Sequence, residues 1–64
     1  MMTLENLFKF VSDEQEVKLI GADFDEVTGF KSTLESVLSD AVLKRSVDCV
    51  EAAFEGVLKV WVKA

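Results

Sequence analysis

The sequence of 64 residues predicts one α+β domain with two layers, an antiparallel sheet and two helices on one face of that sheet. Two segments place apolar residues at helical spacing, and others alternate polar and apolar residues as strands do. The expected order along the chain is α-β-β-α-β-β. Helices on one face of the sheet bury every apolar stripe. We expect a single domain over residues 1–64, near the lower size limit for a core without disulfides, metal or a partner subunit.

The first helix is predicted over residues 4–10, with Thr3 as its N-cap. Its inward stripe has the i, i+3, i+4, i+7 spacing of an amphipathic helix and consists of Leu4, Leu7, Phe8 and Val11. Phe10 falls outside this stripe, so we expect its ring to be exposed. The polar residues Ser12, Asp13 and Glu14 that follow are expected to terminate the helix.

A first pair of strands follows. Residues 16–20 alternate polar and apolar side chains, with Val17 and Leu19 pointing inward. Residues 21–25 suit a turn, and residues 26–28 suit a short returning strand. The sequence thus predicts a hairpin.

The second helix is predicted over residues 33–40. Ser32 and Glu35 have the spacing of a capping box. The apolar residues at helical spacing are Leu34, Val37, Leu38 and Ala41. Two continuations remain open. The helix either extends to Lys44 or breaks at Asp40 into a single turn.

Residues 46–63 predict a second hairpin, closed by a three-residue loop that ends in Gly56. The resulting pairs are Ala53 with Val57, Ala52 with Leu58 and Val50 with Val60. The core face holds Val50, Ala52, Leu58, Val60 and Val62. Asp48 fits that face poorly, so the strand starts near Cys49 or contains a bulge there.

The other face of this hairpin mixes charged side chains with a tryptophan. We predict an interface on it, made by Trp61, Val57, Lys59, Cys49 and Val47. The alternative is that Trp61 packs across the sheet on Ile20 or under a loop. Half of all residues are hydrophobic and the mean hydropathy is +0.27, which favours self-association or a lasting partner.

The formal net charge of −5 lies entirely in the first thirty residues. Acidic side chains border both ends of the first strand and are Asp13, Glu14, Glu16, Asp23, Asp25 and Glu26. Two interpretations are open. These carboxylates keep a hydrophobic protein in solution, or they form an acidic surface that binds a basic protein or imitates the DNA backbone. A calcium loop starting at Asp23 is excluded, because Leu34 stands where the bidentate Glu is required.

The composition argues against several functions. The chain has no His or Tyr, and Cys49 has no His to activate it, so we expect no enzyme activity and no cofactor. Basic residues are few and scattered, so direct binding of nucleic acid is not expected. One cysteine forms no internal disulfide, no signal peptide is recognisable and no apolar run is long enough to cross a bilayer. A cytoplasmic protein is expected.

Four segments also carry a resemblance. They are Thr3-Leu4 to Leu7, Val17 to Leu19, Thr33 to Leu38, and Val57 to Val62. In the spacing of these apolar residues, the chain resembles small acidic proteins encoded by bacteriophages and mobile elements of gut bacteria. The resemblance covers most of the chain and implies the order of elements and a phage-like setting, but no activity.

Together these observations predict a small non-enzymatic domain that binds itself or another protein through the sheet face around Trp61. The competing hypothesis is an acidic phage-type inhibitor or DNA mimic that binds a basic protein through the carboxylates of residues 1–30. No membrane association is expected for either.

Overall fold

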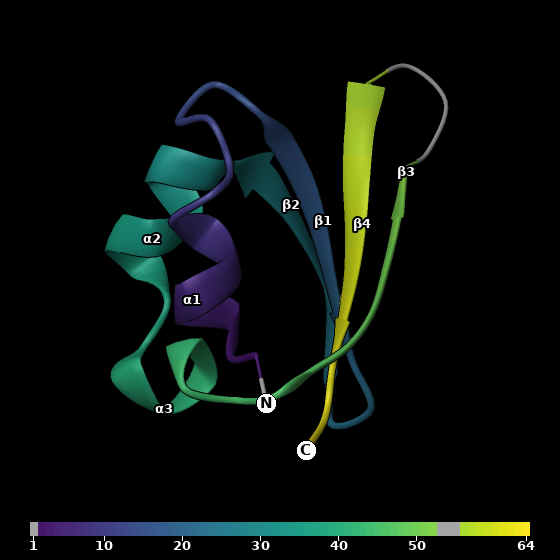
Figure 1. Ribbon diagram of the computed structural model, residues 1–64. Helices are drawn as coiled ribbons and strands as arrows, with labels where there is room; N and C mark the ends of the chain where they lie inside the picture. Colours follow the sequence, from purple (N-terminus) through teal and green to yellow (C-terminus); the bar gives the residue numbers. More distant parts are fainter. Residues whose placement is uncertain (1, 53–55) are drawn as a thin grey trace.

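The computed structural model describes residues 2–52 and 56–64 and has two layers, helices on one side and a four-stranded sheet on the other (Figure 1). The helices are α1 (Leu4–Phe8), α2 (Lys31–Val37) and α3 (Asp40–Leu43). The strands are β1 (Glu16–Gly21), β2 (Phe24–Phe30), β3 (Val47–Ala52) and β4 (Val57–Val62). The predicted α+β class is confirmed, whereas the order along the chain contains one more helix than predicted.

The sheet has the strand order β2-β1-β4-β3 and is mixed. The pairs β1–β2 and β3–β4 are antiparallel hairpins, as predicted, but β1 and β4 run parallel at the centre. The prediction of a purely antiparallel sheet is therefore wrong. The reason lies in the connection between the hairpins, because α2 and α3 carry the chain back along the sheet before β3 begins (Figure 1). Consequently β3 runs in the direction of β2, and β4 in that of β1.

Helix α1 begins as predicted. The Thr3 side chain accepts a hydrogen bond from the backbone N–H of Asn6 (3.2 Å), which satisfies one of the unpaired donors of the first turn. Leu4 and Phe8 are fully buried. The helix ends at Phe8, two residues earlier than predicted, and the ring of Phe10 is 82% exposed as expected.

Helix α2 does not use the predicted capping box. It begins at Lys31, and its N-cap residue makes no side-chain hydrogen bond. Instead, the backbone N–H of Lys31 donates to the carbonyl oxygen of Gln15 (2.9 Å), and that of Ser32 to the carbonyl oxygen of Asp13 (3.2 Å). The loop before β1 thus satisfies the first two backbone donors of α2, and the helix begins two residues earlier than predicted. Glu35 forms an ion pair with Lys31 (3.2 Å).

The predicted second helix is broken rather than continuous. Helix α2 ends at Val37, and α3 forms a single turn from Asp40, which was one of the two open continuations. Ser39 caps this turn, since its hydroxyl accepts a hydrogen bond from the N–H of Val42 (3.4 Å). The break leaves Val37 68% exposed, contrary to its predicted place in an inward stripe.

The second hairpin has the predicted register. The pairs Ala52–Leu58 and Val50–Val60 are observed, and Gly56 has a positive φ of 77°. The predicted pairing of Ala53 lies outside the described residues, as does the start of the loop. A register shift between Val47 and Cys49 makes Asp48 the extra residue of a bulge, which was one of the two predicted solutions.

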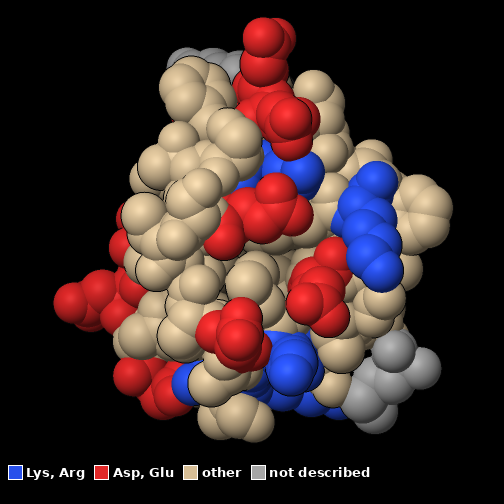
Figure 2. All heavy atoms as spheres, turned by 90° about the vertical axis from the view of Figure 1, so that its left-hand side faces the viewer, with Lys and Arg blue, Asp and Glu red and all other residues tan. Residues whose placement is uncertain are grey.

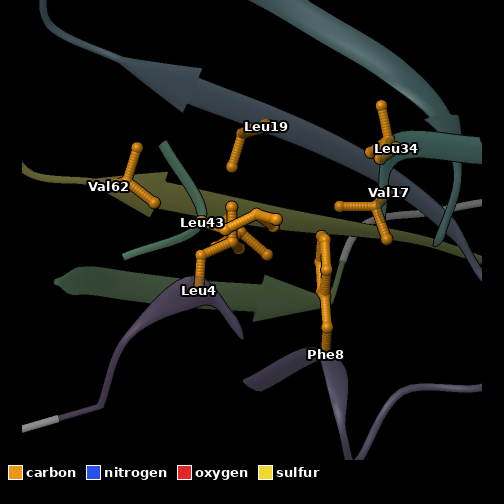
Figure 3. Close-up of a cluster of buried hydrophobic side chains, with 8 residues drawn as sticks. Leu4, Phe8, Val17, Leu19, Leu34, Leu43 and Val62 are labelled. Atoms are coloured by element: carbon orange, nitrogen blue, oxygen red, sulfur yellow. The ribbon is translucent and has the colours of Figure 1, made fainter. Parts of the chain in front are cut away.

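The core lies between the helices and the sheet, where side chains from both layers converge (Figure 3). Its buried members are Leu4, Phe8, Val17, Leu19, Leu34, Leu43, Val60 and Val62. Val17 and Leu19 point inward as predicted, and β2 is longer than its predicted residues 26–28. Within residues 2–52 and 56–64, no helix combines the length and apolar character needed to cross a membrane.

The outer sheet face as candidate functional site

One face of the sheet has no helix over it in the described part of the chain (Figure 1). Alternation defines which residues belong to it, because Val17, Leu19, Val60 and Val62 are buried on the helix side. We call the opposite side the outer face. From the four strands it presents Glu16, Lys18, Ile20, Glu26, Thr28, Phe30, Cys49, Glu51, Val57, Lys59 and Trp61.

The register arranges these residues in three rows across the strands. The first row is apolar and consists of Ile20, Trp61 and Cys49. The middle row is polar and consists of Thr28, Lys18, Lys59 and Glu51. The third row consists of Phe30, Glu16 and Val57. Two rows with apolar members therefore flank a charged one.

Trp61 lies in the middle of the apolar row. Its partner on β1 is Ile20, about 4.8 Å away at the backbone as in any sheet, and its partner on β3 is Cys49. Trp61 and Ile20 are half-buried, and Cys49 is exposed. The indole thus has Ile20 beside it, as the packing alternative required, while the described residues place no helix over that side of the sheet. The Trp61 indole can therefore pack sideways against Ile20 and still present its outer side to a partner.

Four of the five predicted interface residues lie on the outer face. The exception is Val47, which pairs with the buried Val62 and packs against the core. The bulge at Asp48 is the cause, because one extra residue reverses the alternation before Cys49. Phe30 also lies on the outer face but was not among the predicted interface residues; it is 53% exposed and pairs with Glu16.

Most charged side chains of the outer face form no ion pair with another described residue. The ammonium of Lys18 lies 3.9 Å from a carboxylate oxygen of Glu26. Lys59 and Glu51 are neighbours across β4 and β3, but neither forms an ion pair with a described residue. Their charged groups are therefore accessible to another molecule.

Comparison with family models, curated proteins and solved structures found no match to this chain. The description of the site therefore depends on its own geometry. Among the residues that the structure describes, no group of three or more His, Cys, Asp or Glu side chains is placed to hold a metal ion.

The predicted acidic residues do not form one surface. Asp13 and Asp23 belong to opposite ends of β1, and each is bound to a cation of the same chain. Lys31, itself buried, donates to Asp13 (2.7 Å), and this hydrogen bond raises the pKa of Lys31. Figure 2 shows that acidic side chains on the helix side are separated by basic and uncharged ones.

Asp23 is held more firmly. The guanidinium of Arg45 donates two hydrogen bonds to its carboxylate, at 2.6 and 2.8 Å, and holds the pKa of Asp23 below its usual value. The same guanidinium lies 5.5 Å from the centre of the Phe24 ring. This arrangement fastens the segment before β3 to the turn between β1 and β2.

A cleft of about 460 Å³ lies near the end of the sheet where β2 finishes. It is lined by Asp13, Glu14, Phe30 and Ser32. Asp13 is already engaged by Lys31, so the cleft offers few free polar groups to fix a ligand.

Proposed function

We propose that this protein is a non-enzymatic binding domain whose outer sheet face, centred on Trp61, packs against another protein chain. The observation that carries the proposal is the apolar row Ile20–Trp61–Cys49 on a sheet face without a helix over it. Tryptophan contributes strongly to binding when a partner covers it, because it buries a large apolar area in a ring with few rotatable bonds. Charged neighbours such as Lys59 supply the polar rim of such an interface.

The acidic hypothesis has less support from the geometry. An inhibitor or DNA mimic needs carboxylates that are free to meet the cations of its target. Here Asp13, Asp23 and Glu26 each lie within ion-pair distance of a cation of the same chain. Binding through these three acids would compete with the internal pairs, which leaves Glu14, Glu16 and Asp25 as the predicted acids without an ion pair to a described residue.

The test begins by capturing the partner. A photo-crosslinking residue replaces Val57 on the outer face, in cells that naturally make the protein. The same residue in place of the exposed Phe10, on the helix side, is the control. A partner captured from position 57 and not from position 10 is then purified, and its affinity is measured for the wild type and for two variants.

Trp61→Ala is expected to weaken this affinity by about 30-fold or more, the loss typical of a central interface residue. Phe10→Ala, which removes another aromatic side chain, is expected to leave it within about threefold of wild type. An affinity that survives Trp61→Ala, but falls at high salt and in Asp13→Asn or Asp25→Asn, would reject the outer face in favour of the acidic hypothesis.

A further inference from the structure

Positive and negative side chains on the outer face are nearly equal in number. The outer face holds three acids, Glu16, Glu26 and Glu51, and two bases, Lys18 and Lys59. Lys63 follows β4 directly and continues its alternation. With Lys63 included, the outer face carries three charges of each sign.

The rest of the chain is strongly acidic. The sequence has seven basic and twelve acidic residues, and the four bases and nine acids that are not among these six account for the whole formal charge of −5. Taken together, the rest of each copy carries net negative charge, which opposes the approach of two copies through it. The balanced surface allows close approach without net repulsion, and it also carries the apolar row, in which Trp61 and Ile20 are half-buried and Cys49 is exposed.

From this we infer that the partner of the outer face is a second copy of this chain, packed face to face around a twofold axis. The inference depends on the proposed function and names the partner of the same site. Two sheets that pack in this way lie about 10 Å apart, with their side chains interdigitating. Lys59 and Glu51, which have no ion-pair partner among the described residues, then have opposite charges available on the facing copy.

The area of the outer face indicates how lasting such a dimer can be. Four strands at about 4.8 Å spacing and six residues at about 3.3 Å give a face of roughly 19 by 20 Å, or about 400 Å² in projection. A standard stable interface buries about 800 Å² per partner. An interface on so small a face is typical of a transient association, so the dimer is expected to be reversible rather than a permanent assembly.

The experiment measures molecular mass by sedimentation equilibrium from about 1 μM to about 1 mM. Because the chain has one tryptophan, acrylamide quenching of its fluorescence reports directly on whether the outer face is covered. The wild type is expected to dimerise with Trp61 protected from the quencher. Added salt should leave the affinity unchanged or increase it, because it screens the net charge of −5 on each copy.

Two charge variants test the face without assuming which residues meet. Lys59→Glu makes the face net acidic and Glu51→Lys makes it net basic, so each is expected to weaken its own dimer by at least about tenfold. A mixture of the two is expected to form a heterodimer in which Trp61 is protected again. The double variant Lys59→Glu/Glu51→Lys keeps the balance and should dimerise like the wild type.

Lys9→Glu is the matched control. It makes the same change in net charge at an exposed residue on the helix side, and the dimer should persist. Circular dichroism of each variant establishes that it is folded.

A wild type that stays monomeric over the whole concentration range would overturn the second copy as partner, while the proposed binding face keeps its own test with Trp61→Ala. A dimer that survives both charge variants, and in which Trp61 remains as quenchable as in the monomer, would show that another surface associates. That result would also overturn the second copy as the partner of the outer face.

Discussion

Leu19 offers the most direct test of the two-layer arrangement. Its side chain has no exposed surface, and in the sheet it lies between Val27 of β2 and Val60 of β4. Leu-to-Ala substitutions at such sites cost about 3 to 5 kcal/mol, because they lose the transfer free energy of the removed atoms and leave a cavity. A chain of this length has a total stability of roughly 3 to 10 kcal/mol. Leu19→Ala should therefore remove a third or more of the free energy of unfolding.

The assay is urea unfolding followed by circular dichroism, at a protein concentration low enough to keep the chain monomeric. The control is Lys18→Ala, because Lys18 is adjacent in β1 and points to the outer face. We expect this control to shift the urea midpoint much less than Leu19→Ala. Equal losses at the two positions would mean that β1 does not present alternate residues to a core and to an uncovered face, and the assignment of faces would be wrong.

Three further predictions concern single contacts. Arg45 lowers the pKa of Asp23, so their ion pair contributes stability that is fully present above about pH 4 and is lost as pH falls through the lowered pKa. In Asp23→Asn this contribution is missing, and the urea midpoint should therefore fall less steeply at acid pH than it does in the wild type. Gly56→Ala should cost about 1 kcal/mol in urea unfolding, because φ is +77° and nothing lies within 4 Å of the added Cβ; a neutral result would contradict the left-handed conformation. Gly21→Ala should lower the melting temperature, because the new methyl group collides with the Phe24 ring. In the double variant Gly21→Ala/Phe24→Ala the collision is absent, so the loss of stability should be smaller than the sum of the two single losses.

Local features were predictable from the sequence. The register of the second hairpin follows from the position of Gly56 and from the alternation that places Val60 inward. Thr3 was identified as a cap because its hydroxyl reaches a donor three residues away. In each case the interacting groups are close in the chain, so their spacing contains the information.

Features that depend on distant segments were not predictable. The parallel pairing of β1 with β4 joins residues about forty positions apart, and no local pattern indicates it. Ser32 has the spacing of a cap but lies inside the helix, because the carbonyl groups of Asp13 and Gln15 accept from the N–H groups of Ser32 and Lys31 and the helix begins at Lys31. The position of Ile20 beside Trp61 was one of the predicted alternatives, but it is this distant pairing of β1 with β4 that selects it.

The position of β4 in the sheet affects how the chain can be made. This strand is the last described one in chain order, yet it occupies a central position between β1 and β3. During synthesis β1 is therefore without one of its two neighbours until residue 62 has left the ribosome, and the core lacks Val60 and Val62 until then. A nascent chain that stalls before β4 exposes an unpaired apolar strand, which is the kind of edge that chaperones and aggregates recognise.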